Sequence, residues 1–512
     1  MTEMNERRGR DQRRGERLCR AAAAAGVFLA AWVAAPPAAS AFDPATTHAG
    51  LTQQAVIAST LHQVLARRLA RPLGLFDPIA LHPEVIDTDQ RRALLAGLAA
   101  LDPAGGYRPG DDGVAPGLSF VMAGSVLAKT PPERIQHLFL DPSTGQGLRD
   151  DAAVDGFLHA VRVLADSGLS FRGTATGTAF ALEGQPSLQW LEAPDNDLGL
   201  PVFHQQMERA IADPDPAQRS SALARALLAL GGVLTVLEDA GNPAQVRNDF
   251  RAAYLGGHTG GPFDRASPFE RTVVDLYGLG GIPAAREVVR RKSLREFFTA
   301  ADGQGLADRT QRRFFSEGTI PEDGVVDPET TTADIVRDAR KSLTYALPTV
   351  PRLELRQMGK RQYLLAAEGG RAPARRLLGY ERVPGRVRFF LDRAVHIDSA
   401  RALLPEIAGY AAGLIDHLFR AEVTLARDGD RVRATLVAPT GRIYGGDLRL
   451  FAEDAAGRRR VIGTFPAAGG APDGVSVSVP PEARRIAAVL RGQDEAGPVV
   501  AFGELPLPPP RP

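Results

Sequence analysis

The chain has 512 residues, with 61 Lys and Arg against 60 Asp and Glu, so its formal net charge is +1. Hydrophobic residues make up 44% of the chain and charged residues 24%, which are the proportions of an ordinary globular protein. This composition excludes a disordered charged chain and a polytopic membrane protein. At about 150 residues per domain, the length suggests roughly three domains.

The first 41 residues have the pattern of a secretory signal peptide. A polar, basic segment ends at Arg20, an uncharged apolar run follows over Ala21–Ala35, and Ala39-Ser40-Ala41 matches an A-x-A cleavage site. We therefore expect residues 1–41 to be removed and the protein to be exported, either to the periplasm or out of the cell. The alternative is an uncleaved membrane anchor, although the run is shorter than the ~20 residues that a spanning helix needs.

Cleavage at this position also removes Cys19, the only cysteine of the sequence. The exported chain then has no disulfide bond, and no thiol for catalysis or metal binding. We expect no transmembrane segment in the mature chain.

Residues 42–346 are predicted to form a helical domain. Apolar residues recur at helical spacing in four of its segments, which are Gln53–Leu69, Ala153–Ala165, Pro216–Asp239 and Ala284–Phe298. Residues 347–420 are predicted as a Pro- and Arg-rich linker followed by an amphipathic helix, whose apolar face includes Ile407 and Leu414.

Beyond Arg420 the hydrophobic period changes to two, so residues 421–505 are predicted to form a small β-sandwich. Seven short strands are expected, at Glu422–Ala426, Arg431–Val437, Asp447–Ala452, Val461–Phe465, Val475–Val479, Ile486–Leu490 and Val499–Leu505. Residues 506–512 form a proline-rich tail. The predicted fold class is therefore mainly α, with a C-terminal β-sandwich.

The linker is unusually basic, because Arg352–Arg393 contains eleven Arg and Lys and only four Asp and Glu. Such a stretch is typical of an anion-binding face for phospholipid headgroups or a nucleic-acid backbone. A solvated hairpin is the simpler interpretation, since only four of the cations of this chain are lysines and arginine is abundant throughout.

Four segments of the helical region carry the residues on which a family resemblance rests. They are Thr46–Thr52, Gly124–Pro142, Ala226–Phe250 and Ser267–Glu270. In this order and spacing they resemble the zinc-dependent phospholipase C and single-strand-specific nuclease family, in its secreted bacterial branch. The resemblance implies a helical domain that binds three zinc ions and hydrolyses phosphodiesters with a metal-held hydroxide.

The ligands implied by the resemblance are an aromatic N-terminus, five histidines and three carboxylates. Five residues of this chain match by type, and these are Phe42, His48, His137, Asp239 and Glu270. Four ligand positions are lost: Thr235, Gln245 and Ala266 stand where histidines are expected, and Lys129 or Ala128 stands in place of the bridging aspartate. The last loss is independent of the alignment, because no Asp or Glu occurs between Asp112 and Glu133.

These replacements weaken the predicted metal site. Thr and Gln are poor zinc ligands beside imidazole, and a lysine ammonium about 4 Å from Zn²⁺ opposes it by roughly 8 kcal/mol at an effective dielectric of about 20. We therefore expect fewer than three zinc ions, or none. Glu133 and His258 are candidates to compensate for the lost carboxylate and histidine.

A metal-free alternative uses the same residues. The Lys129 ammonium is then paired with Asp239 near His137 inside the former site; otherwise Lys129 points into solvent.

Two functions follow from the site, and the sequence leaves open whether the protein is an enzyme. One is an exported, weakly active or non-catalytic binding protein with a degraded metal site, whose extracellular ligand is unknown. The other is an active hydrolase of phospholipid or nucleic-acid phosphodiesters that uses a reduced or rebuilt zinc site. A third alternative gives the function to the β-sandwich, docked on a surface.

Overall fold

The computed structural model describes thirteen segments of the chain. These are residues 42–101, 113–130, 132–148, 184–249, 267–278, 281–320, 324–325, 353–358, 361–366, 374–383, 386–439, 441–467 and 474–508. The predicted signal peptide, the predicted helix Ala153–Ala165 and the residues His258 and Ala266 lie outside the described residues.

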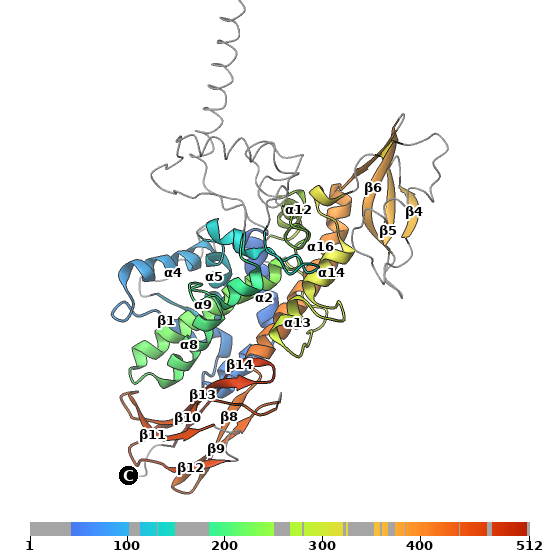
Figure 1. The fold of residues 1–512 in the computed structure, drawn as a ribbon. Helices are drawn as coiled ribbons and strands as arrows, with labels where there is room; N and C mark the ends of the chain where they lie inside the picture. Colours follow the sequence, from blue (N-terminus) through green and yellow to red (C-terminus); the bar gives the residue numbers. More distant parts are fainter. Residues whose placement is uncertain are drawn as a thin grey trace, which may run out of the picture.

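Helices form most of the N-terminal part and strands most of the C-terminal part (Figure 1). The helices are η1 (Pro44–His48), α2 (Ala49–Ala58), α3 (Leu61–Gln63), η2 (Val64–Arg68), η3 (Gly74–Phe76), α4 (Thr88–Ala100), α5 (Gly117–Leu127), η4 (Pro132–Leu138), α7 (Ser187–Glu192), α8 (Leu200–Ala212), α9 (Pro216–Asp239), α10 (Pro243–Val246), α12 (Pro268–Tyr277), α13 (Leu294–Phe298), α14 (Leu306–Arg313), η6 (Glu317–Thr319) and α16 (Arg393–Leu418). The strands are β1 (Pro78–Ala80), β2 (Val114–Pro116), β3 (Gly324–Val325), β4 (Leu353–Met358), β5 (Arg361–Ala366), β6 (Arg375–Val383), β7 (Arg386–Phe390), β8 (Glu422–Asp428), β9 (Arg431–Val437), β10 (Asp447–Glu453), β11 (Arg459–Pro466), β12 (Val475–Ser478), β13 (Arg485–Asp494) and β14 (Gly497–Pro506).

Helix α9 is the centre of the helical part and begins and ends where the sequence predicts. The Asp215 side chain caps its N-terminus by accepting a hydrogen bond from Ala217 N, and Pro216 occupies the first turn. By length and composition α9 is apolar enough to cross a membrane, but 89% of its most apolar window is buried inside the protein. Its apolar surface is therefore covered by α5, α8 and neighbouring elements, as in the core helix of a globular domain.

Two glycines let α5 and α9 approach until their backbones touch. A Cβ on Gly124 would lie 1.9 Å from Leu228 O, and a Cβ on Gly231 would lie 1.9 Å from Val121 O. No side chain fits at either position without moving one helix. The C-terminal ends of both helices are thereby held close together, and this end of the helical part contains the candidate site.

The C-terminal β-sandwich contains all seven predicted strands. Strands β11, β10, β13 and β14 form one antiparallel sheet, and β12, β9 and β8 form another. Inward-facing residues of both sheets, such as Val423, Leu450 and Ala488, share one buried cluster. The hydrophobic residues of the alternating sequence pattern face this core, and the polar residues between them lie on the outer faces.

The predicted linker contributes most of a further sheet. Strands β3, β7, β6, β5 and β4 pair in that order, with β3 coming from the chain before the linker. Leu364, Leu378, Tyr380 and Phe389 are buried in one cluster. Several arginines of the basic stretch are paired with acids there, among them Arg376 with Asp398 at 2.8 Å. Helix α16 runs from this sheet to the sandwich (Figure 1). The solvated hairpin expected from the sequence is therefore replaced by a folded sheet.

Two predicted helices differ from the structure because tertiary contacts override the helical pattern. The predicted helix Gln53–Leu69 breaks at Ser59, where Asp416 accepts hydrogen bonds from both the N–H and the hydroxyl of Thr60, each at 2.7 Å. In the segment Ala284–Phe298 only α13 is helical. The chain before α13 lies against α16, where the N–H of Val289 donates to the carbonyl of Gly409 at 3.1 Å.

Two buried histidines mark the side of the helical part that meets the sandwich. Burial lowers the pKa of His204 in α8 to about 4, and the charges of Arg491 and Arg420 lower it further. Burial also lowers the pKa of His417 in α16 to about 4; Arg420 adds to the effect, and Asp494 opposes it. Both side chains are therefore held neutral in the folded protein.

We expect these histidines to make the protein sensitive to acid. Their pKa in the unfolded chain is near 6.5, so the unfolded state binds more protons as pH falls from about 6.5 to about 4. The free energy of unfolding should fall over this range by roughly 3 kcal/mol per histidine. Urea unfolding at stepped pH measures this effect. The double variant His204→Leu, His417→Leu should flatten the dependence, and an unchanged slope would contradict the assignment.

Candidate functional site: a buried lysine and carboxylate cluster

The candidate site lies where the ends of four helices meet. His48 ends η1, Lys129 follows α5, Asp239 ends α9, and Glu270 lies in the first turn of α12. All four residues are buried, with at most 4% of their surface exposed. A helix C-terminus carries partial negative charge, so the ends of α5 and α9 favour a cation between them.

Lys129 provides that cation. Its Nζ atom lies 3.0 Å from Asp239 Oδ1, and both side chains are inaccessible to solvent. Nζ also makes a long contact of 3.5 Å to the carbonyl oxygen of Phe42. Lys129 is thus a buried ammonium paired with a buried carboxylate. The metal-free alternative predicts this pairing of Lys129 with Asp239.

His48 lies between two neighbouring carboxyl groups. Its Nδ1 is 2.5 Å from Glu238 Oε2, and its Nε2 is 3.2 Å from Asp239 Oδ1. Thr52 donates a hydrogen bond to the other oxygen of Glu238 at 2.8 Å. One imidazole therefore connects the last two residues of α9.

The pKa shifts follow from burial and from these contacts. Burial and the charge of Lys129 lower the pKa of His48, but the charge of Asp239 and the hydrogen bonds to Asp239 and Glu238 outweigh them, so the net pKa is raised. Burial raises the pKa of Glu238, and the contact with His48 opposes the rise. A proton is therefore retained on the short contact between His48 and Glu238.

Glu270 is held by three hydrogen-bond donors. Its Oε1 accepts from the backbone N of Phe42 at 3.1 Å and from Asn242 Nδ2 at 3.1 Å. Its Oε2 accepts from the N–H of Ser267 at 3.1 Å, and the Ser267 hydroxyl accepts from the N–H of Glu270, so the pair forms a capping box. Burial raises the pKa of Glu270 to about 8, although the charge of Lys129 and the hydrogen bonds from Ser267 and Asn242 oppose the rise.

The other predicted site residues have separate surroundings. Thr235 donates its hydroxyl to Gly231 O at 3.1 Å within its own helix. Gln245 is fully buried, and no described residue forms a hydrogen bond with its side-chain amide. His137 stacks on Trp190 with ring centroids 4.3 Å apart, and burial lowers its pKa. The side chain of Glu133 lies outside the described part of the structure.

The donor set can be tested against a zinc ion. Glu238 orients His48 through Nδ1, as carboxylates orient metal-bound histidines. Nε2, however, faces Asp239 directly, and Lys129 binds the same carboxylate oxygen. A zinc ion on Nε2 and Asp239 at about 2.0–2.2 Å would have to displace the ammonium. Within the described residues, no group of three His, Cys, Asp or Glu side chains is arranged to hold a metal ion. While Lys129 is paired with Asp239, the residues present do not fit the metal.

The sequence did not point to Glu238, Thr52 or Asn242. Glu238 lies 190 residues from His48 along the chain, and its neighbour Asp239 already matched the expected carboxylate. The adjacent Glu-Asp pair at the end of a long apolar helix was the available signal, because a charged residue is almost never fully buried without a partner.

The chain has only weak similarity to known proteins. No family model matches the chain, and no curated protein matches it. Among solved structures, the alpha toxin from Clostridium absonum is 10% identical, with 92% of this chain and 100% of the toxin covered and a TM-score of 0.22. The alpha-toxin of an avian strain of Clostridium perfringens is 9% identical, with coverages of 91% and 99% and a TM-score of 0.22. The structural likeness is weak at these scores, and the family resemblance stays a prediction.

Proposed function

We propose that the protein is an exported relative of the zinc-dependent phospholipase C and nuclease family that has become a non-catalytic, metal-independent binding protein. The observation that carries the proposal is the buried contact of 3.0 Å between Lys129 Nζ and Asp239 Oδ1. In this proposal the lysine supplies the positive charge that the carboxylates of the site need, and zinc is not required for folding.

The charge balance of the cluster supports the proposal. Glu238, Asp239 and Glu270 are three buried carboxyl groups. They face the Lys129 ammonium and His48, whose raised pKa favours its cationic form. Unpaired charges in a protein interior cost several kcal/mol each, so a stable cluster is close to neutral. Adding Zn²⁺ beside Lys129 would introduce repulsion of roughly 8 kcal/mol at a separation of about 4 Å and an effective dielectric of about 20.

The surroundings of Phe42 are consistent with export. Phe42 is fully buried, and its backbone nitrogen lies 3.1 Å from Glu270 Oε1. Cleavage after Ala41 would convert this nitrogen into an ammonium group beside Glu270. The new charge would balance the third carboxylate and lower its pKa from the value of about 8. Removal of the leader would therefore strengthen the cluster.

The proposal is tested by the metal content and activity of the protein recovered from the cell envelope or medium. N-terminal sequencing should find Phe42 as the first residue. After equilibration with zinc and removal of the excess, the protein should retain no zinc and should not hydrolyse bis(p-nitrophenyl) phosphate or phosphatidylcholine.

Stoichiometric zinc, together with hydrolysis that a chelator abolishes, would replace the proposal with the alternative of an active phosphoester hydrolase. Recovery of the protein only in the cytoplasm, with residues 1–41 intact, would contradict the exported part of the proposal.

A further inference from the structure

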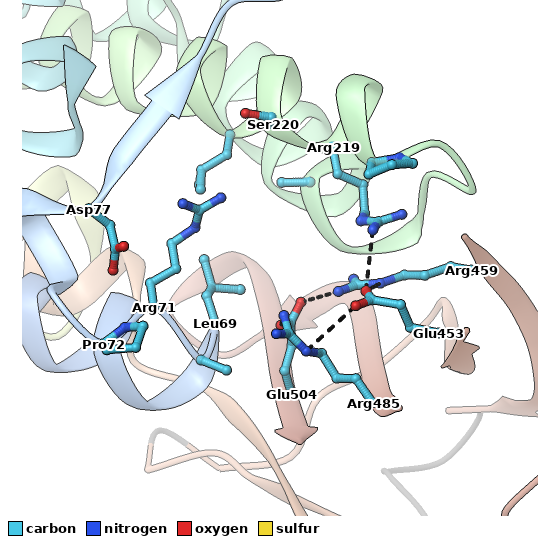
Figure 2. A pocket seen from close by; sticks show the side chains of 14 residues that line it. Leu69, Arg71, Pro72, Asp77, Arg219, Ser220, Glu453, Arg459, Arg485 and Glu504 are labelled. Atoms are coloured by element: carbon cyan, nitrogen blue, oxygen red, sulfur yellow. Dashed lines mark hydrogen bonds and ion pairs between the residues drawn. The ribbon is translucent and has the colours of Figure 1, made fainter. Parts of the chain in front are cut away.

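A second feature lies away from the lysine cluster, between the helical part and the sandwich. A cavity of about 330 Å³ is present there (Figure 2), large enough for a small organic molecule. Part of its wall is apolar and includes Leu69, Ala210 and Leu223. The rest is charged, with Arg71, Arg219, Arg459 and Arg485 facing Asp77, Glu453 and Glu504.

Two of the four arginines, Arg459 and Arg219, are held by several bonds within the structure itself. Arg459 binds Glu453 Oε2 at 2.8 Å and Glu504 Oε1 at 2.5 Å, and its third nitrogen donates to the carbonyl of Ile211 at 2.6 Å. Arg219 binds Glu453 Oε2 at 3.2 Å and donates to three backbone carbonyls. These contacts join the sandwich to α8 and α9 and occupy most of the donors of Arg459 and Arg219.

Arg71 is different. Among the described residues, its guanidinium makes one long contact of 3.5 Å, to the carbonyl of Pro78. No dashed line reaches Arg71 in Figure 2, whereas the other three arginines form one network with Glu453 and Glu504. Arg485 also keeps donor capacity, because it binds Glu504 at 2.8 Å and approaches Glu453 only to 3.7 Å. Four arginines against three carboxyl groups give the lining one positive charge in excess.

Because Arg71 is half-buried, its guanidinium should bind an anion more strongly than an exposed one would. Burial lowers the pKa of Arg71, and the like charge of Arg485 contributes, while Asp77 and Glu504 oppose the shift. A guanidinium that has lost part of its hydration gains more from a carboxylate than a fully hydrated one does. Its planar pair of N–H groups also matches the two oxygens of a carboxylate.

We propose that this cavity binds a small organic carboxylate, with the carboxylate on Arg71 and a short apolar chain against Leu69 and Leu223. The excess positive charge of the lining selects the anion, and the apolar wall selects the chain. The site shares no residue with the cluster of Lys129 and Asp239, so it does not depend on the function proposed for that cluster.

Titration calorimetry of the whole protein with hexanoate at constant ionic strength tests the proposal, with hexanol as the neutral probe of equal length. Hexanoate should bind, and hexanol should bind at least about tenfold more weakly. Arg71→Gln should weaken hexanoate binding about tenfold, and Arg71→Lys should weaken it less, because the charge is kept and the paired geometry is lost. Arg92→Gln, which removes an exposed arginine of α4, is the matched control and should bind as the wild type does.

Absence of hexanoate binding to the wild-type protein overturns the proposal, as does equal binding of hexanol. Unchanged affinity in Arg71→Gln overturns it as well. If Arg71→Gln does not fold, the comparison of hexanoate with hexanol on the wild-type protein still decides the proposal, and Arg71→Lys tests only the role of the paired N–H groups.

Discussion

The variant Lys129→Asp is expected to lose at least about 3–5 kcal/mol of unfolding free energy in the presence of a chelator. Removing one member of a buried ion pair leaves the other charge without compensation. Asp239 and Glu238, both fully buried, then lie beside a new carboxylate. Urea unfolding of the wild type and the variant in EDTA measures the loss.

The same variant should respond to zinc, and the wild type should not. An aspartate at position 129 can join His48 and Asp239 as a third ligand, so zinc should restore part of the lost stability. Lys129→Met removes the charge without adding a carboxylate and should be destabilised without recovery by zinc. Lys292→Asp, at an exposed lysine, is the control and should change stability by less than about 1 kcal/mol. An unchanged melting temperature of Lys129→Asp in chelator would refute the role of the lysine.

The second large effect is expected at the interface between the helical part and the sandwich. Arg459 is 2% exposed and neutralises both Glu453 and Glu504, which are 13% and 4% exposed. Arg459→Met should lower the unfolding free energy by about 3 kcal/mol. This value is at the lower end of the range for broken buried pairs, because both glutamates keep Arg485.

The neighbouring residue is a matched control. Arg460 and its partner Glu482 are 61% and 53% exposed, so Arg460→Met should cost no more than about 1 kcal/mol. Thermal and urea denaturation of both variants gives the comparison. Equal losses in the two variants would show that burial of the Arg459 network does not contribute to stability.

The strands of the sandwich could be predicted because their signal is local. One face of each strand meets the shared core and the other meets solvent, so hydrophobic and polar residues alternate along its sequence. In β9, for example, Val432 and Ala434 are buried while Arg431 and Arg433 are exposed. The sheet of β4–β7 escaped prediction because arginines are frequent in its strands, and the high arginine content suggested a solvated segment.

The helices that were predicted wrongly depended on distant residues. Thr60 leaves the helical path because Asp416, 356 residues away, takes two of its hydrogen bonds. The chain before α13 follows the surface of α16, where Gly409 and Gly413 leave room for its backbone. Helical periodicity predicts which side chains share an apolar face. It does not predict where a tertiary contact replaces the hydrogen bonds of the helix.

In the candidate site, too, some features could be predicted from the sequence and others depend on contacts between distant residues. The family resemblance, carried by residue types at spaced positions, was enough to select His48, Lys129, Asp239 and Glu270, which the structure brings to one end of the helical part. The stacking of His137 on Trp190 and the contact of His48 with Glu238 depend on the paths of α7 and α9. No spacing along the chain contains that information.

The crossing of α5 and α9 has a consequence for how this site can evolve. Gly124 and Gly231 fix the point where the two helix backbones touch. Lys129 lies a short way beyond it after α5, and Asp239 lies at the end of α9. The main-chain contact therefore limits how far apart the backbones at positions 129 and 239 can lie. A single codon can change the ionic character of such a site while the scaffold is inherited intact.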